Sequence, residues 1–190
     1  MDLSINEQHQ ITKLSNLMHS LLALDQVWTR SLPPVAAPVA SVEARASLAA
    51  VGQEIEQQWR DLGKQAAVVE QILERRAPDL DRELPARLAQ LPLSKEQLDA
   101  FTAYVNRQGG YGNATKQAMD EIRRSAATER NDVRAKLAAL GKGGEVRGDM
   151  SKRAECGILF GAAILLTLTA VAPLAAAGIG GFIARGCVAQ

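Results

Sequence analysis

The sequence predicts an all-α protein: a long helical hairpin or bundle, followed by an apolar C-terminal segment, rich in Gly and Ala, that inserts into a membrane. Aromatic residues make up only 4% of the 190 residues, while Ala, Leu, Glu, Gln, Lys and Arg, which lose least on entering a helix, are abundant. Apolar residues recur at three- and four-residue steps through two long segments. Near the C-terminus, the 29 residues between Glu155 and Arg185 carry no charge, and one membrane crossing needs about 20.

The charges divide the chain into a body and a tail. Lys and Arg number 22 and Asp and Glu 21, for a net charge of +1, and Arg185 is the only charged residue after Glu155. We therefore expect a soluble helical body over residues 1–155 and a membrane-inserting tail over residues 156–190. The nearly neutral body lacks the basic field on which non-specific nucleic-acid binding depends, so no nucleic acid is expected among the partners.

The N-terminal 30 residues do not have the pattern of a secretory signal. Charged and histidine side chains are spread through the region where the apolar part of a signal peptide would lie, namely Glu7, His9, Lys13, His19 and Asp25. We therefore expect the chain to be made in the bacterial cytoplasm without a signal peptide.

The first helix is expected at about residues 5–30. Ser4 and Glu7 have the spacing of a capping box, in which each side chain accepts a hydrogen bond from the other's backbone N–H. Residues 31–38 include three prolines and should form an extended linker after the helix. The apolar face of the helix comprises Ile11, Leu14, Leu17, Met18, Leu21, Leu22, Leu24 and Trp28.

Two longer helices are expected over residues 41–76 and 114–140. A helix of about 35 residues is roughly 50 Å long, so it should pack along another long helix. The glycine-rich residues 141–144 should end the second of the pair. The apolar stripe of the first comprises Leu48, Val51, Ile55, Leu62, Val69 and Ile72, and that of the second Met119, Ile122, Ala126, Val133, Leu137 and Leu140.

Between these helices, Pro78, Pro85 and Pro92 indicate an irregular connector. Ser94 and Gln97 then repeat the capping-box spacing, and a shorter helix is expected over residues 94–108.

The apolar tail has two membrane topologies, divided by Pro173. In one continuous helix, Phe160 and Phe182 would be roughly 33 Å apart, close to the thickness of the hydrocarbon layer. A hairpin turning near Pro173 or Gly178 would have arms too short to cross fully. The alternative outside a membrane is a hairpin buried at the centre of a soluble domain. We disfavour it because the body, judged from its sequence, is too amphipathic and too thin to enclose a helix that is apolar all round.

The tail holds more small residues than an anchor requires. In lipid, small residues spaced by four let helices approach closely, which favours oligomers or hairpins. Threonine hydroxyls and the carbonyl freed by a proline would supply a polar seam between copies. The residues assigned to membrane insertion and oligomerisation are Gly157, Gly161, Thr167, Thr169, Ala172, Pro173, Ala176, Gly178, Gly180, Gly181 and Ala184.

The two cysteines, Cys156 and Cys187, lie at opposite ends of the tail. In a continuous helix they would be roughly 46 Å apart, far beyond the reach of a disulfide. A disulfide within one chain would therefore exclude the straight helix and favour a hairpin or a folded-back state.

No pattern in the sequence indicates catalysis, a cofactor or a metal. His9 and His19 are ten residues apart, without a cysteine or carboxylate at metal-ligand spacing. The glycine-rich residues 109–113 lack the Lys-Ser/Thr ending and the preceding strand of a phosphate-binding loop. We expect a protein that is not an enzyme.

Residues 157–186 resemble the glycine-zipper segments of small antibacterial pore-forming toxins, including effectors carried by type VI secretion systems. The resemblance implies a toxin that inserts its tail into a membrane, oligomerises and dissipates ion gradients. The implied partners are a lipid membrane, further copies of the chain, a secretion carrier and an immunity protein. The alternative is a tail-anchored membrane protein whose coiled-coil body is a protein-interaction module.

Overall fold

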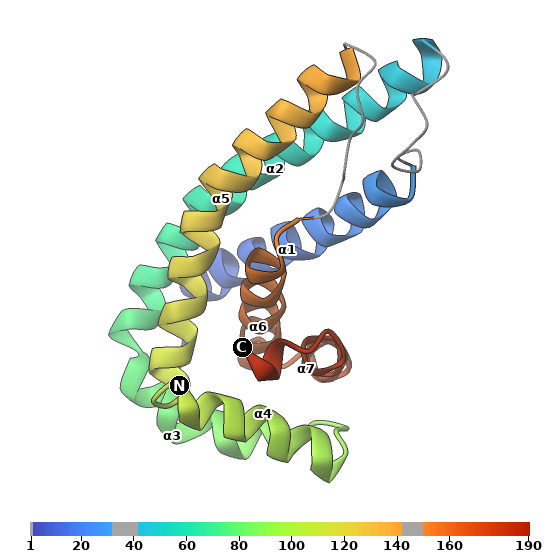
Figure 1. The fold of residues 1–190 in the computed structure, drawn as a ribbon. Helices are drawn as coiled ribbons and strands as arrows, with labels where there is room; N and C mark the ends of the chain where they lie inside the picture. The colour runs from blue at the N-terminus through green and yellow to red at the C-terminus, as the bar shows by residue number, and fades with distance from the viewer. Residues whose placement is uncertain (1, 32–41, 142–149) are drawn as a thin grey trace.

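The computed structural model describes residues 2–31, 42–141 and 150–190, and every regular element within these ranges is helical (Figure 1). The all-α prediction is confirmed. The elements are α1 (Ile5–Ser31), α2 (Val42–Arg75), α3 (Ala77–Leu88), α4 (Lys95–Arg107), α5 (Tyr111–Gly141), α6 (Lys152–Leu168), α7 (Ala172–Ala184) and the 3₁₀ turn η1 (Cys187–Ala189). The expected linker at residues 32–38 and the glycine-rich residues 142–144 lie outside the described part of the chain.

Helices α2 and α5 run side by side along most of their length (Figure 1) and share the largest interface between elements in the structure. Their apolar stripes meet in the core, while charged residues bridge their outer edges. Arg123 of α5 pairs with Glu70 of α2, and the Arg134 Nε atom lies 2.5 Å from Glu56 Oε1. The expected pairing of these two long helices is confirmed.

Helix α1 begins with the expected capping box. The Ser4 N–H donates to Glu7 Oε2 at 2.9 Å, and the Glu7 N–H donates to Ser4 Oγ at 3.2 Å. Glu7 also accepts a hydrogen bond from Arg76 Nη2 at 3.1 Å, which ties the start of α1 to the end of α2. The hydrogen bond from the Ser4 backbone, followed by that from Arg76, holds the pKa of the Glu7 carboxyl below its ordinary value.

We expect Glu7→Gln to lower stability at pH 7 and to do so less at acidic pH. Glutamine can keep the capping box, so the substitution removes mainly the charge that pairs with Arg76. Because the folded-state pKa of Glu7 is lowered, its stabilisation is present above the ordinary pKa near 4.5 and is lost as the pH falls through the folded value. Thermal melts at pH 7 and pH 3 measure the difference.

The control for this prediction is Glu74→Gln. Glu74 is paired with Lys116 on an exposed surface, where an ion pair contributes little. A difference in melting temperature between wild type and Glu7→Gln that grows toward pH 3 would contradict the lowered pKa of Glu7.

The proline-rich connector contains a helix that the sequence analysis did not expect. Pro78 lies in the first turn of α3, where a helix does not need its N–H, and Pro85 lies inside the helix. Pro85 removes one backbone hydrogen bond from the helix. Burial of three leucines spaced by four compensates for this loss: Leu80, Leu84 and Leu88. Helix α4 then starts at the expected capping box, with the Gln97 N–H donating to Ser94 Oγ at 3.1 Å.

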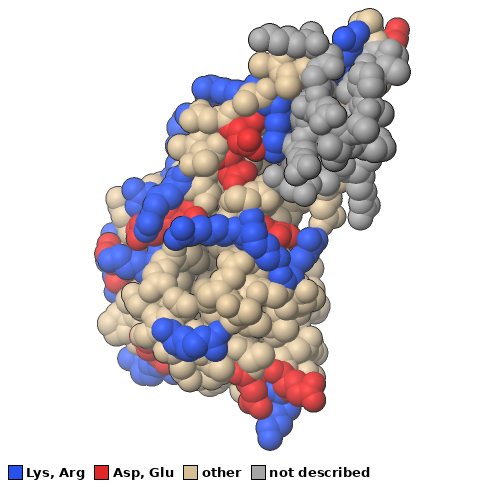
Figure 2. Space-filling model, in the orientation of Figure 1, with Lys and Arg blue, Asp and Glu red and all other residues tan. Residues whose placement is uncertain are grey.

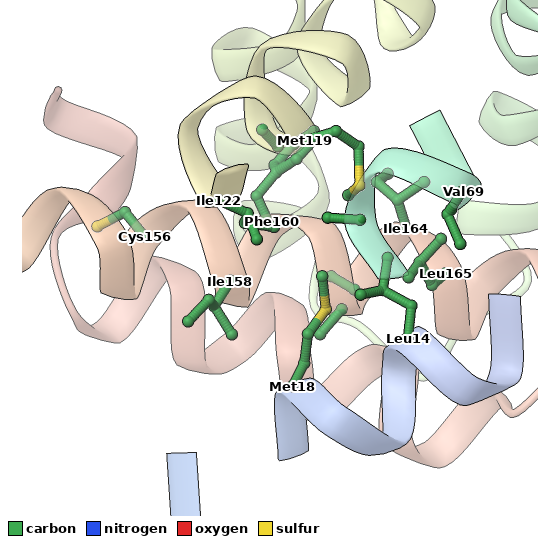
Figure 3. Close-up of a cluster of buried hydrophobic side chains, with 14 of the residues drawn as sticks. Leu14, Met18, Val69, Met119, Ile122, Cys156, Ile158, Phe160, Ile164 and Leu165 are labelled. Atoms are coloured by element: carbon green, nitrogen blue, oxygen red, sulfur yellow. The ribbon is translucent and has the colours of Figure 1, made fainter. Parts of the chain in front are cut away.

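Helix α6 forms the centre of the core. Of its 17 residues, 13 are buried, and it packs against α1, α3, α5 and α7. Figure 3 shows Met18 of α1, Val69 of α2 and Met119 of α5 gathered around it. The expectation that the body is too thin to enclose an apolar helix is therefore wrong, because α1, α3 and α5 cover α6 together with α7.

Candidate functional site

The apolar tail is folded into a helical hairpin of α6 and α7, which we call the α6–α7 hairpin (residues 152–184). The turn at its tip is a Schellman motif: the Val171 N–H donates to the Leu166 carbonyl at 3.0 Å and the Ala170 N–H to the Thr167 carbonyl at 3.3 Å. Ala170 takes the left-handed conformation, with φ of +58°, at the position where glycine is usual. The turn therefore lies a few residues before Pro173 rather than at it.

A disulfide closes the open end of the hairpin. Cys156 in the first turns of α6 and Cys187 just beyond α7 are bonded, with their Cα atoms 5.6 Å apart. The continuous helix considered for the tail is excluded by this bond, as the separation of the two cysteines in a straight helix predicts. Among the described residues, no helix has the length and apolarity to cross a membrane. Of the two arrangements left open by the sequence, the structure therefore has the folded hairpin.

The polar groups assigned to a seam between copies have partners inside the hairpin. Thr167 Oγ1 donates to the Ala163 carbonyl at 2.8 Å, and Thr169 Oγ1 donates to the Leu165 carbonyl at 2.9 Å. Pro173 lies in the first turn of α7, where no backbone N–H is required. These residues therefore complete the two helices rather than line a polar path.

Three of the assigned glycines allow close packing within the chain. A Cβ atom on Gly161 would lie 2.9 Å from Met119 Cε of α5. A Cβ atom on Gly157 would lie 3.4 Å from the Glu121 side chain of the same helix, and one on Gly178 would lie 3.4 Å from the Ala163 Cα of α6. Gly157 and Gly161 thus face α5, while Gly178 faces α6.

The remaining small residues lie on the outer side of α7. Ala172, Ala176 and Gly180 are half-buried and Ala184 is exposed. Gly181 is also half-buried, close to Leu159. The ladder spaced by four is therefore at the surface in the single chain.

Helix α7 presents an uncharged surface to solvent, which we call the outer face of α7 (Val171, Pro173, Leu174, Ala177 and Ala184). Leu174 is 51% exposed and Val171 37%, and none of the 13 residues of α7 has a polar side chain. Figure 2 shows mostly uncharged surface over the lower half of the molecule, where Figure 1 places α4, α6 and α7. Exposed helices of globular proteins normally carry polar residues on this side.

Charged side chains bind the backbone at both ends of the hairpin. At the tip, Arg87 Nη1 of α3 donates to the Leu168 carbonyl at 3.1 Å. At the open end, Arg185 Nη1 lies 3.0 Å from Glu155 Oε1, and Lys152 donates to the Arg185 carbonyl. These contacts satisfy carbonyl groups at helix C-termini.

Four aromatic rings join the hairpin to α4. The Phe160 ring stacks on Phe101 with centroids 5.4 Å apart and meets Phe182 edge-on at 5.6 Å. Tyr104 lies 5.0 Å from Phe182, and burial raises the pKa of its phenol. No sequence signal joins these four positions, because α4 is far from α6 and α7 in the chain.

Comparisons with family models, with curated proteins and with solved structures found no match. Within the described part of the chain, no group of three or more His, Cys, Asp or Glu is placed to hold a metal ion. The α6–α7 hairpin, with its uncharged helix α7 and its disulfide, is therefore the candidate functional site.

Proposed function

We propose that the chain is a pore-forming antibacterial protein that keeps its apolar hairpin packed among amphipathic helices and releases it into a lipid bilayer. The resemblance of residues 157–186 to type VI secretion effectors is the reason for proposing a bacterial membrane as the target. It also implies a secretion carrier and an immunity protein. The observation that carries the proposal is α7: it has no polar side chain, yet Leu174 and its neighbours face solvent.

The chemistry of the hairpin suits hydrocarbon. A bilayer core offers no hydrogen-bond partners, so every polar group that enters must already be paired. The hydroxyls of Thr167 and Thr169 donate to carbonyls of their own helix, an arrangement that carries into lipid unchanged. The 29 uncharged residues avoid the cost of about 2.5–3.5 kcal/mol that each buried Asp, Lys or Arg imposes on membrane insertion.

The lengths of α6 and α7 limit how far the hairpin enters a bilayer. At about 1.5 Å per residue, α6 is roughly 26 Å long and α7 roughly 20 Å, both shorter than the roughly 30 Å hydrocarbon core. The folded hairpin therefore reaches into the bilayer without crossing it. The surface ladder of Ala172, Ala176 and Gly180 provides a face on which copies can pack in lipid.

The proposal is tested by dye release from vesicles of phosphatidylethanolamine and phosphatidylglycerol. We expect wild-type protein, assayed both as purified and after reduction, to release the dye, and Leu174→Lys to release at least tenfold less because it places a charge on the outer face of α7. The substitution should change the free energy of unfolding by no more than about 0.5 kcal/mol, since Leu174 is exposed.

Val68→Lys is the matched control. Val68 is an apolar residue on α2 with similar exposure, 43%, and lies outside the hairpin, so this variant should release dye like wild type. Equal release by Leu174→Lys and wild type would contradict insertion through α7. Binding to vesicles without release of dye would contradict pore formation.

A further inference from the structure

The disulfide lies on the wall of a cavity of about 320 Å³ between α4, α5 and the hairpin. Cys156 and Cys187 both line this cavity, together with Tyr104, Gln117, Glu121 and Arg153. Little of either cysteine is exposed to solvent, 7% of Cys156 and 1% of Cys187. The cavity is therefore the side from which a small molecule would approach the S–S bond.

The bond encloses the whole of α7 in a covalent loop between two cysteines that are 31 positions apart in the sequence. While it is closed, the Cα atoms at the two ends of the hairpin are held 5.6 Å apart, and the hairpin cannot open. Once it is broken, α7 is held only by packing and by contacts such as the Arg185–Glu155 ion pair.

The tip of the hairpin is suited to straightening. Ala170 is the only described residue other than glycine with a positive φ, and alanine disfavours this left-handed conformation by about 1–2 kcal/mol. Joining α6 and α7 through Thr169, Ala170 and Val171 gives a helix over residues 152–184, roughly 50 Å long. Such a helix exceeds the thickness of the hydrocarbon core, and Pro173 would kink it.

We propose that this cavity is a site of thiol–disulfide exchange with a small-molecule thiol, and that reduction of Cys156–Cys187 frees the hairpin to straighten across a membrane. The exchange itself is independent of the proposed function, whereas its consequence in the membrane rests on it.

The exchange takes two steps. A thiolate enters the cavity and attacks Sγ of Cys156, the more accessible cysteine, so that the S–S bond breaks and Cys187 leaves as a thiolate. A second thiolate attacks the sulfur of the small molecule in the mixed disulfide and releases Cys156. The small thiol is oxidised to its own disulfide, and the two protons lost by the two thiols pass to the two cysteines.

The cavity wall carries two arginines and one carboxylate side chain, Glu121. Arg153 and Arg124 both line the cavity, and positive groups stabilise a thiolate. Each arginine forms an ion pair with a carboxylate. Arg153 Nε lies 2.9 Å from Glu121 Oε2, and Arg124 Nη2 lies 3.7 Å from Asp120 Oδ2. Both guanidinium groups are thus held in place at the cavity wall.

The site is tested first without membranes, by following reduction of the native protein with glutathione through alkylation and mass measurement. We expect Gln117→Trp, which places a bulky ring at the cavity wall, to slow reduction at least tenfold. Thr128→Trp, at an exposed position of the same helix away from the cavity, should leave the rate unchanged. Equal rates for Gln117→Trp and wild type would overturn the cavity as the route of entry.

The consequence is tested with the phosphatidylethanolamine and phosphatidylglycerol vesicles. We expect reduced protein, and the Cys156→Ser/Cys187→Ser double variant, to release dye at least tenfold faster than oxidised protein. Circular dichroism before addition of vesicles verifies that each form is folded. Equal release by oxidised and reduced protein would overturn control by the disulfide while leaving pore formation intact. Absence of release from every form would overturn pore formation and the membrane role of the bond together, and the glutathione rates would still decide the exchange site.

Discussion

Replacing Phe160 by alanine is expected to lower the free energy of unfolding by about 3–5 kcal/mol, the range for removing a large aromatic side chain from a core. Phe160 is 1% exposed and contacts the rings of Phe101, Tyr104 and Phe182. Its loss leaves a cavity at the point where α4, α6 and α7 meet. For a chain of this size the melting temperature should fall by roughly 6–20 °C, measurable by calorimetry.

The matched control for Phe160 is Leu174→Ala, which removes an apolar side chain from the exposed side of the same hairpin. Because Leu174 is half exposed, we expect a loss within about 0.5 kcal/mol. A loss below about 1 kcal/mol for Phe160→Ala would contradict the position of α6 at the centre of the bundle.

The second large effect is expected from Leu165→Lys, which should destabilise the protein strongly at neutral pH. Leu165 is fully buried at the contact of α6 with α1 and α2 (Figure 3). Burial lowers the pKa of a lysine by up to about 3–5 units, from about 10.4 to roughly 5.4–7.4. At pH 7 the cost is therefore limited to about 1.36 kcal/mol for each of the roughly 3.4 units between pH 7 and 10.4, or about 4–5 kcal/mol.

The pH dependence of Leu165→Lys identifies the cause. The unfolded state binds a proton below about pH 10.4, while the folded state keeps the introduced lysine neutral. Stability therefore rises with pH up to that value. Urea titrations at pH 7 and pH 10 measure the recovery, with Leu174→Lys as the exposed counterpart. A variant that is stable at pH 7, with no dependence on pH, would show that position 165 is open to water.

Much of the fold was predictable from the sequence because it depends on local signals. Ser4 with Glu7 and Ser94 with Gln97 mark helix starts through contacts three residues apart. Apolar residues at three- and four-residue steps mark the two long helices that pair. Helix α3 does not follow from such local signals, because proline usually ends a helix. In the first turn of a helix it costs nothing, and the buried leucines outweigh the second proline.

The place of the tail was not predictable in the same way. An uncharged run satisfies the interior of a protein and that of a membrane equally, so composition does not distinguish them. In the structure, the tail lies in the protein interior because α6 contacts α1 and α5, which come from opposite ends of the body. The pairing of Cys156 with Cys187 likewise depends on the turn at Ala170, where alanine occupies a position that usually signals itself by glycine.

The central position of α6 has a consequence for biosynthesis. The ribosome makes α1 to α5 before α6, so residues 1–141 emerge while the space that α6 fills between α1 and α5 is empty. At about 5–20 residues per second, the last 49 residues take roughly 2–10 s to be added. During that interval Leu14, Met18 and Met119, all buried in the finished fold, have no partner on α6. We therefore expect the nascent chain to expose apolar side chains that bind chaperones, and a chain ending before residue 152 to be recognised as incompletely folded.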